Sequence, residues 1–595
     1  MRRLEHIAEV ARYACIYQSI IGYVCKFLFG LLHGVTVYIL IVRYHHMRII
    51  GCNVISEVFA PCDEILPFVL IEPFHGIAYL EEVGTLPYYV GGLIENREEL
   101  IVNTPESYAA LTGVKVLTGR EAISVDSEAK TVVVRCTDTG EEEIHSYDRL
   151  VIATGASPAI PPIEGVGKAG VYTMRTPADA IGIRDYVKEH TVRNAVVVGG
   201  GFIGLEAAEN LQRLGLSVAV LDVAGQILPG VLDSEMANYV QRHLTRRGIR
   251  IVTGAKAEQI QGLDRVTGIK TSAGLFPAEL VILSAGIRPN TAFLQGSGIE
   301  MIRGAIVTGP QMETNLPDVY AAGDCALVTN RLTGQRQWSP MGSSANLEGR
   351  TLAQGPAGRK KTYPGVLGTG VVKLPGLNCG RTGLTEAQAK EAGYDVATIL
   401  AVTDDKAHYY PDAAFFITKL IADRKTHQLL GMQVLGPGAV DKMVDIAVIG
   451  LNLKARLEDF ENADYAYAPP FSTAIHPFVQ AVYLLLNKLD GTLVSMTPAE
   501  YAAGAAQGYR IIDVAPRPAI PGATFVDLSS VQGEIPGIGK EEKLLLVCVR
   551  AKRAYFLQNR LRYYGYRNTV VLEGATSFNE VKVPDSAPVV LTHQG

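Results

Sequence analysis

Cysteine is sparse and irregularly spaced in this chain of 595 residues. There are eight cysteines, and no two of them form a CxxC pair or a regular series. A disulfide framework or a zinc site needs such spacing, so we expect neither, and the pattern favours a reducing cytoplasm. No cysteine occurs between Asp63 and Arg135. That stretch therefore offers no thiol for catalysis.

An excess of charge of one sign is also lacking. Lys and Arg total 55 against 60 Asp and Glu, which gives a formal net charge of -5. A nucleic-acid partner usually demands a basic excess, so we expect no nucleic acid to bind. At about 150 residues for each domain, the length predicts roughly three to five domains.

One long hydrophobic run is present, over residues 16–42. Its length would span a bilayer, but Lys26 and His33 interrupt it and no signal-peptide cleavage site follows. Three interpretations stay open: a membrane anchor, a buried or irregular extension, and a chain start upstream of a true start at Met47. We favour the last two and expect no membrane contact.

A glycine-rich turn joins a strand to a helix in the sequence NAVVVGGGFIGLEAAENL, residues 194–211. Gly199 permits a tight turn, Gly201 lets the backbone approach a pyrophosphate, and Gly204 lets the helix pack closely on the strand. The helix N-terminus would face the phosphates. The pattern predicts a dinucleotide-binding cradle, and a turn used only for packing is the alternative.

The next predicted strand, residues 217–221, leads into Asp222. A carboxylate at this place can accept hydrogen bonds from both hydroxyls of an adenosine ribose, and it would repel the 2′-phosphate of NADPH. The residues that follow, Val223 to Gln226, include no arginine that could pair with that phosphate. The sequence therefore predicts NADH as the cofactor, with NADPH as the alternative.

Strands and helices alternate through residues 165–287, which predicts an α/β fold with a parallel sheet covered on both faces. Ligands bind at the carboxyl ends of such strands. In residues 318–325, DVYAAGDC, a predicted strand delivers Asp324 just beyond Gly323. An aspartate so placed can bind the ribityl or diphosphate part of a flavin.

Near the C-terminus a cysteine follows the apolar strand KLLLV. Cys548 precedes a predicted helix over residues 554–564, and Arg550, Lys552 and Arg553 lie between them. Loop amides, the helix N-terminus and these cations would lower the pKa of the thiol and make Cys548 a nucleophile. An inert cysteine at a strand end is the alternative.

Five motifs occur in a fixed order along the chain: ATGASP, VVVGGGFIGLEAAENL, SAGIRPN, YAAGDC and YAPPF. In this order they resemble the pyridine nucleotide-disulfide oxidoreductase family, and within it the coenzyme A-disulfide reductases and NADH oxidases that carry a rhodanese domain. The resemblance covers residues 86–595. It implies two Rossmann-like domains for FAD and NAD, an α+β dimerisation domain, a C-terminal α/β rhodanese-like domain, and a homodimer.

The sequence pattern and the resemblance together give the expected domain boundaries. We expect an apolar extension at 1–47, an FAD-binding domain at 48–164 and 288–361, an NAD(P)H-binding domain at 165–287, an interface domain at 362–485, a linker at 486–505 and a rhodanese-like domain at 506–595. The first strand of the FAD-binding domain is predicted at Arg48–Gly51. No metal site is implied.

Candidate site residues follow from the same resemblance. Besides the cradle and Asp222, the cofactor-binding residues are expected to be Glu72, Thr154, Gly155, Gly286, Gly323 and Asp324. Tyr410 and Tyr467 match a tyrosine pair that approaches the thiol substrate and could protonate a departing thiolate, with interface packing as the alternative. Four residues separate Cys548 from Arg553, the compact loop of rhodaneses, whereas tyrosine phosphatases have one residue more.

Two features of the family are missing from the sequence. The first glycine cradle has no counterpart after the predicted strand, where only Gly51 remains, and no redox cysteine lies shortly before Leu86. Cys52 and Cys62 are candidates only if the backbone follows an unexpected path. The first 85 residues are either natural and divergent or the product of a shifted reading frame. FAD binding is in question in both cases.

The leading hypothesis is an FAD- and NADH-dependent oxidoreductase acting on coenzyme A disulfide, persulfide or polysulfide. Hydride would pass from NADH to the flavin and then to sulfur, while Cys548 carries sulfane sulfur. One alternative is an NADH oxidase that reduces oxygen without a cysteine relay. The other is a catalytically impaired reductase that acts as a persulfide carrier through Cys548.

Overall fold

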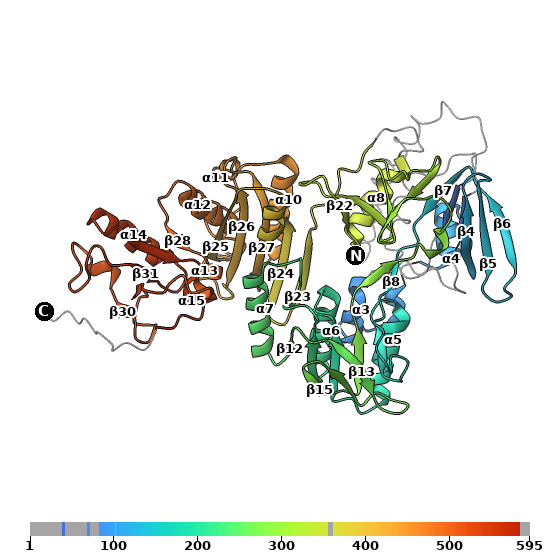
Figure 1. Ribbon diagram of the computed structural model, residues 1–595, viewed down its shortest axis with the longest axis horizontal. Coiled ribbons are helices and arrows are strands. Elements are labelled where there is room, and N and C mark those ends of the chain that lie inside the picture. The colour runs from blue at the N-terminus through green and yellow to red at the C-terminus, as the bar shows by residue number, and fades with distance from the viewer. Residues whose placement is uncertain (1–37, 42–67, 72–82, 102, 355–360, 584–595) are drawn as a thin grey trace, which may run out of the picture.

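The chain folds into four domains, shown in Figure 1. The computed structural model describes residues 38–41, 68–71, 83–101, 103–354 and 361–583. We refer to the described parts of residues 38–158 and 287–354 as the first domain, 159–286 as the second, 361–489 as the third and 490–583 as the fourth.

The first domain is built on a five-stranded parallel sheet in the order β20-β7-β1-β2-β3. Its strands are β1 Tyr38–Ile41, β2 Phe68–Ile71, β3 Lys115–Leu117, β7 Arg149–Ile152 and β20 Val319–Ala321. Because β7 and β20 are parallel neighbours, the turns that follow them lie at the same edge of the sheet. This edge holds the predicted Thr154–Gly155 and Gly323–Asp324 turns.

The position of β1 differs from the prediction. Arg48–Gly51 lies outside the described residues, and the structure instead places a strand inside the predicted extension, where Tyr38–Ile41 pairs with β2 on one side and β7 on the other. An apolar stretch such as Tyr38–Ile41 suits the centre of a parallel sheet as well as it suits a membrane, so its sequence alone does not distinguish the two. Within the described ranges, the length and apolarity needed to cross a bilayer are not found together in any helix.

Two smaller sheets and several helices complete the first domain. One sheet is antiparallel, with β4 Arg120–Asp126, β5 Thr131–Cys136 and β6 Glu142–Ser146. The other contains β18 Met301–Ile302, β19 Ala305–Val307, β21 Ala326–Thr329 and β22 Arg336–Trp338. A two-stranded connection to the second domain pairs β8 Ala156–Pro158 with β17 Ile287–Pro289. The helices are α3 Leu86–Val90, α4 Pro105–Thr112 and α8 Gly342–Gln354.

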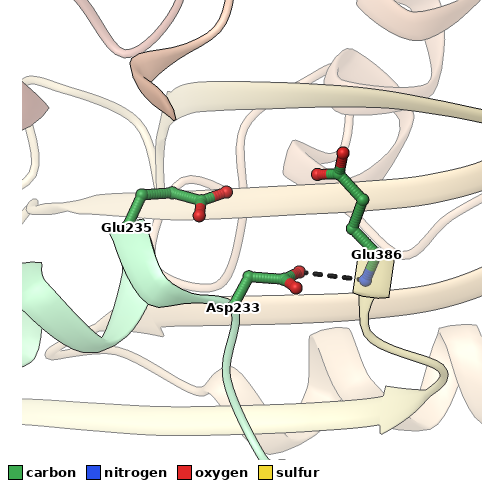
Figure 2. A group of neighbouring side chains, drawn as sticks. All are labelled: Asp233, Glu235 and Glu386. Carbon is green, nitrogen blue, oxygen red and sulfur yellow. Dashed lines mark hydrogen bonds between the residues drawn. The ribbon is translucent and has the colours of Figure 1, made fainter. Parts of the chain in front are cut away.

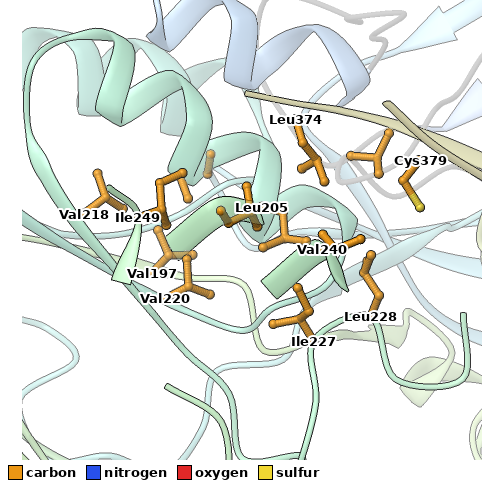
Figure 3. Packing of buried hydrophobic residues seen from close by; sticks show 14 of the residues in the cluster. Val197, Leu205, Val218, Val220, Ile227, Leu228, Val240, Ile249, Leu374 and Cys379 are labelled. Carbon is orange, nitrogen blue, oxygen red and sulfur yellow. The ribbon is translucent and has the colours of Figure 1, made fainter. Parts of the chain in front are cut away.

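The second domain confirms the predicted parallel sheet behind the glycine-rich turn. Its strand order is β12-β11-β10-β16-β9, with β9 Val171–Thr173, β10 Asn194–Val198, β11 Ser217–Leu221, β12 Arg250–Val252 and β16 Leu280–Leu283. Val197 and Val220 of the sheet share a buried core with Leu205 and Val240 of the helices (Figure 3). The remaining elements are α5 Pro177–Glu189, α6 Phe202–Arg213, α7 Ser234–Arg246, β13 Ala257–Gln261, β14 Gly268–Thr271 and β15 Gly274–Pro277.

The third domain is a five-stranded antiparallel sheet in the order β23-β24-β27-β26-β25. Its elements are β23 Gly370–Leu374, β24 Leu377–Gly383, α9 Glu386–Glu391, β25 Val396–Asp404, β26 Phe415–Asp423, β27 Leu429–Gly436, α10 Val440–Leu453, α11 Glu458–Glu461 and α12 Pro477–Leu489. Leu374 and Cys379 belong to the same buried cluster as the second-domain core (Figure 3). The second and third domains are therefore packed together by apolar contact.

The fourth domain is a parallel sheet in the order β28-β32-β31-β29-β30. Its elements are β28 Ser495–Met496, α13 Pro498–Ala502, β29 Arg510–Asp513, β30 Thr524–Phe525, β31 Leu544–Val547, α14 Lys552–Tyr563, β32 Thr569–Leu572 and α15 Ala575–Phe578. The strand β28 lies inside the predicted linker 486–505, and α12 also extends beyond 485. A two-residue strand leaves no hydrophobic pattern that the sequence could reveal, so β28 was not predicted there.

Candidate functional site

Two glycines of the predicted cradle are required by the packing of the turn itself. Gly199 has a φ of +116°, and a Cβ there would lie 2.1 Å from the carbonyl oxygen of Ser284. A Cβ on Gly204 would lie 2.0 Å from the carbonyl oxygen of Gly199. Both positions exclude any other residue on steric grounds.

Gly201 differs from its two neighbours in the motif. It has a φ of -79° as the N-cap of α6, and a Cβ built on it would meet no protein atom within 4 Å. The protein packing therefore does not need glycine here. The α6 N-terminus begins beside this open space without a side-chain cap, which leaves backbone N–H groups available to an anion such as a pyrophosphate.

Asp222 lies directly behind the same turn. Its Oδ2 accepts a hydrogen bond from the Gly200 amide at 2.7 Å, and its Oδ1 accepts one from the Ala224 amide at 2.8 Å. The carboxylate thus holds the glycine turn and keeps a negative charge at the end of β11. Carboxylate oxygens accept more than one hydrogen bond, so these contacts are compatible with the predicted ribose contact.

Thr154 and Gly155 lie where the first and second domains are joined. The Thr154 hydroxyl donates to the Asn290 carbonyl at 2.7 Å, and the Asn290 side-chain amide donates to the Thr154 carbonyl at 2.9 Å. Gly155 has a φ of +62°, and its carbonyl accepts a hydrogen bond from the backbone N–H of Asn290. Gly286, with a φ of +99°, lies just before the paired strand β17. These residues connect the domains as well as line the candidate cofactor edge.

Asp324 forms an ion pair that the sequence did not indicate. Arg175, which precedes α5, donates from Nη2 to Asp324 Oδ2 at 2.8 Å. Both residues are buried, with exposed fractions of 8% and 4%. Burial lowers the pKa of Arg175 to about 10, which the charge of Asp324 partly offsets. The pair fixes the Gly323–Asp324 turn against the second domain, although 149 positions separate its members.

Glu348 of α8 is a second residue that sequence reasoning missed. Its Oε2 accepts a hydrogen bond from the Gly323 amide at 2.8 Å. The side chain is 2% exposed, and burial raises its pKa to about 8. The carboxyl is therefore protonated below that pH while it supports the turn that carries Asp324.

We expect Glu348→Gln to change how stability depends on pH. Between pH 4.5, the ordinary carboxyl pKa, and about 8, the native state holds a proton that the unfolded state releases. The free energy of unfolding should therefore fall as pH rises through this window, by at most about 1.4 kcal/mol per unit. Glutamine keeps an acceptor for Gly323 and cannot ionise, so urea unfolding at several pH values should show a shallower decline. If the free energy of unfolding fell equally steeply with pH in both proteins, Glu348 would not be the group that holds this proton.

The two predicted tyrosines lie in different surroundings. Tyr410 is half-buried, and the Lys406 ammonium lies 5.8 Å from its ring centroid. Tyr467 is exposed, and a hydrogen bond with Tyr409 raises its pKa. The structure therefore pairs Tyr467 with Tyr409, the neighbour of the predicted residue. Glu72 lies outside the described residues, as do Cys52 and Cys62.

His476 is a further buried polar residue beside the YAPPF motif. Its ring stacks on Tyr465 at a centroid distance of 4.9 Å, and its Nδ1 accepts a hydrogen bond from the Phe478 amide. Burial lowers its pKa to about 4, so the imidazole is neutral at neutral pH. The sequence carried no signal for this residue beyond the His-Pro step at the start of α12.

Cys548 follows β31 as predicted, and its turn leads directly into α14. The residue is 3% exposed, and Ala551 adopts a left-handed conformation with a φ of +67° at the helix start. Arg553 donates from Nε to the Val514 carbonyl at 2.7 Å and lies 3.6 Å from Asp527. Cys548 is therefore a buried cysteine between a strand and a helix, while Val549 after it is exposed and α14 begins at Lys552, two residues before the predicted start.

The cations around this loop are arranged differently from the prediction. Arg550 forms an ion pair with Asp404, the last residue of β25 in the third domain. Lys552 is exposed and lies over the Phe556 ring at 5.9 Å. Arg550 therefore joins the fourth domain to the third. Its long side chain reaches the carboxylate of Asp404, which lies 146 residues away in the sequence.

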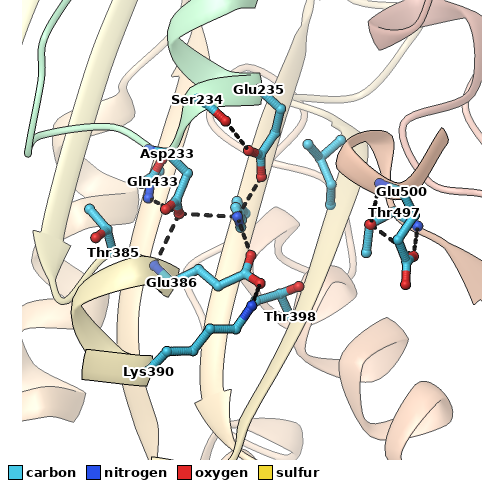
Figure 4. Close-up of polar contacts among 12 residues, drawn as sticks. Asp233, Ser234, Glu235, Thr385, Glu386, Lys390, Thr398, Gln433, Thr497 and Glu500 are labelled. Carbon is cyan, nitrogen blue, oxygen red and sulfur yellow. Dashed lines mark hydrogen bonds and ion pairs between the residues drawn. The ribbon is translucent and has the colours of Figure 1, made fainter. Parts of the chain in front are cut away.

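Three carboxylates converge at the junction of the second and third domains. Asp233, Glu235 and Glu386 bring oxygen atoms within 4.8 Å of one another, a spacing that could hold a metal ion (Figure 2). The ammonium of Lys419 lies among them, 3.0 Å from Asp233 and 2.7 Å from Glu386, and it also bonds to Glu235. Figure 4 shows how Asp233, Glu235 and Glu386 point toward one another, with Lys390 beside Glu386. Lys419 already supplies the compensating positive charge, so the cluster is an ion-pair network.

Comparison with known proteins agrees with this geometry. Residues 78–345 match the family model described as pyridine nucleotide-disulphide oxidoreductase, and residues 371–478 match the model of that family's dimerisation domain. The NAD(P)H coenzyme A polysulfide/persulfide reductase of Pyrococcus horikoshii is 36% identical over 66% of this chain and 87% of its own length. An NADH oxidase of Methanocaldococcus jannaschii is 34% identical over 68% of this chain and 90% of its own length.

Solved structures extend the similarity to the fourth domain. A NAD-dependent persulfide reductase from A. fulgidus has a TM-score of 0.84 at 30% identity and covers 91% of this chain and 99% of its own. The reduced CoADR-RHD of Bacillus anthracis has a TM-score of 0.85 at 26% identity and covers 92% of this chain and 98% of its own.

Proposed function

The chain belongs to the pyridine nucleotide-disulphide oxidoreductase family, and on that basis we propose that it uses NADH to reduce coenzyme A disulfide, persulfide or polysulfide. Members of this family are flavin-dependent NAD(P)H oxidoreductases, with FAD and NAD(P)H as cofactors. The observation that carries the proposal is the presence, in one packed chain, of a dinucleotide cradle and a cysteine loop suited to sulfur transfer.

The nucleotide part of the proposal rests on the cradle and Asp222. Open space at Gly201 admits a pyrophosphate, and the uncapped start of α6 supplies donors for it. The charge of Asp222 lies where the 2′ position of the adenosine ribose would come, and it disfavours a phosphate there. NADH is therefore the proposed reductant.

The described residues at the β7 and β20 edge fit FAD. Thr154, Gly155, Gly323 and Asp324 would hold it, since two parallel strand ends place glycine turns and a carboxylate side by side. Glu348 and the Arg175 pair support this edge from behind. A bound flavin accepts a hydride and passes on electrons. The protein residues bind and orient it.

Sulfur handling is assigned to Cys548. Its thiolate would attack the outer sulfur of a donor such as thiosulfate, so that the S–S bond breaks, sulfite leaves with the electron pair, and Cys548 becomes a persulfide. The N-terminus of α14, with its left-handed Ala551, lies beside the loop and favours negative charge there. Arg553 supports the loop through its bond to Val514.

We expect Cys548→Ser to lower thiosulfate sulfurtransferase activity at least about 100-fold, because serine cannot form a persulfide. Sulfite release from thiosulfate in the presence of cyanide measures this step, and NADH-dependent flavin reduction should be unchanged. Cys136→Ser, at a buried cysteine of β5 in the first domain, is the matched control and should keep full activity. If the Cys548→Ser protein kept the parental sulfurtransferase activity, Cys548 would not be the nucleophile that carries sulfur.

NADH oxidation by oxygen is the second candidate function. It is favoured by the absence of a cysteine between Asp63 and Arg135. It is also favoured by Cys325 and Cys379, because burial raises the pKa of both thiols and so disfavours the reactive thiolate. Anaerobic stopped-flow separates the two functions. The flavin is first reduced by NADH, and coenzyme A disulfide or air is then added. The substrate that reoxidises the flavin restores its absorbance near about 450 nm. Reoxidation by air alone would overturn the disulfide proposal.

A homodimer is the proposed assembly. The third domain corresponds to the family's dimerisation domain, and it exposes large apolar side chains, among them Ile449 and Leu453 on one face of α10 and Phe471 in the YAPPF motif. Such side chains gain stability from burial against a second copy.

A further inference from the structure

The segment Glu573–Glu580, which we call the bracket, contacts the second domain, the third domain and the Cys548 loop of the fourth. It follows β32 and contains α15, which Figure 1 shows on the side of the fourth domain that faces α7. We propose that the bracket sets the conformation of the Cys548 loop from the second domain, with Phe578 as the positioning residue. This inference rests on the proposed function of Cys548 and adds a residue to it.

Phe578 packs against the second domain. It is 4% exposed and belongs to the buried cluster that second-domain and third-domain residues form together. Its ring stacks on Tyr239 of α7 at 5.2 Å between centroids and 5° between planes. Arg242, one turn further along α7, donates to the Phe578 carbonyl at 2.9 Å. Both the side chain and the backbone of Phe578 are therefore held by α7.

The residues just before Phe578 hold the Cys548 loop. The Thr576 amide donates to the Cys548 carbonyl at 3.1 Å, and the Thr576 hydroxyl donates to the same oxygen at 3.3 Å. The Ser577 amide donates to the Val549 carbonyl at 3.1 Å. Because Phe578 is the next residue, a shift of its ring on α7 would be transmitted to these bonds through one or two peptide units.

The first residue of the bracket anchors it to the third domain. Glu573 is 3% exposed, and its carboxylate accepts from the Leu400 amide at 2.8 Å, from Lys488 at 2.6 Å and from the Ser495 hydroxyl at 2.6 Å. Gly574 follows with a φ of +71°, where a Cβ would lie 2.7 Å from Leu400. The bracket is thus fixed at both ends, and the Cys548 contacts lie between the fixed points.

The test compares two substitutions of the α7 residue in the full-length protein. Tyr239→Ala removes the stacking partner and leaves the fourth domain unaltered, whereas Tyr239→Phe keeps the ring. We expect Tyr239→Ala to raise the rate of Cys548 alkylation by iodoacetamide at least about fivefold, as the loop opens more often. Its kcat/KM for thiosulfate should fall about tenfold, because the nucleophile is misplaced. Mass spectrometry of the Cys548 peptide gives the first value.

Tyr239→Phe should match the parent in both measurements. Phe578→Leu removes the other ring of the stacked pair, so it should change the alkylation rate and kcat/KM as Tyr239→Ala does. A purely structural role would lower the melting temperature of Tyr239→Ala and leave alkylation and transfer at parental values well below that temperature, which would overturn the inference. If the parent itself lacks sulfurtransferase activity, the proposed function of Cys548 fails, and the alkylation rates alone decide whether the bracket controls the loop.

Discussion

Lys419→Met is expected to lower the free energy of unfolding by about 3–5 kcal/mol, because it removes the counter-charge of the buried Asp233 and of the partly buried Glu235. Lys419 is 3% exposed on its side chain and pairs with Asp233, Glu235 and Glu386. Asp233 is also held by Gln433 at 2.6 Å, so the carboxylates cannot simply turn to solvent. Urea unfolding followed by circular dichroism measures the loss.

Lys390→Met is the matched control for this substitution. Lys390 pairs with Glu386 of the same cluster but is 61% exposed, so its removal should cost about 0.5 kcal/mol or less. Adding Glu235→Gln to Lys419→Met should restore part of the stability, since one buried charge is then removed. A Lys419→Met protein as stable as the parent would show that the network contributes nothing to the junction of the second and third domains.

Gly201→Ala is expected to weaken NADH binding at least about tenfold while the fold is unchanged. The added methyl group meets no protein atom within 4 Å, and the φ of -79° suits alanine, so the free energy of unfolding should stay within about 1 kcal/mol of the parent. The same methyl group would occupy the space through which a pyrophosphate reaches the α6 amides. Fluorescence titration with NADH gives the dissociation constant.

Gly204→Ala provides the contrast within the same motif. Its Cβ would lie 2.0 Å from the Gly199 carbonyl oxygen, so α6 must move away from the turn, at a cost of about 1–3 kcal/mol in stability. We expect this protein to lose both NADH affinity and stability. If Gly201→Ala binds NADH as tightly as the parent, the open space beside α6 is not where the pyrophosphate lies.

Local features of the site could be predicted from sequence because each is encoded by neighbouring residues. The cradle is a strand, a turn and a helix start in one continuous run, and the glycine positions follow from the close approach of its own backbone. The Cys548 turn is equally local, between β31 and α14. The strand at Tyr38–Ile41 was not predicted, since hydrophobicity alone does not distinguish a central strand from an apolar extension.

By itself, the sequence determined the order of the domains, the glycine turn and the cysteine loop, because short-range periodicity and steric limits specify them. Only the tertiary structure decided which charges meet. Arg175 and Asp324, Lys419 and its carboxylates, Arg550 and Asp404, and Phe578 on α7 each join segments far apart along the chain. Such pairs depend on how the domains pack, and long charged side chains carry no pattern that reveals their partner. The residues that position the site were therefore visible only once the domains were assembled.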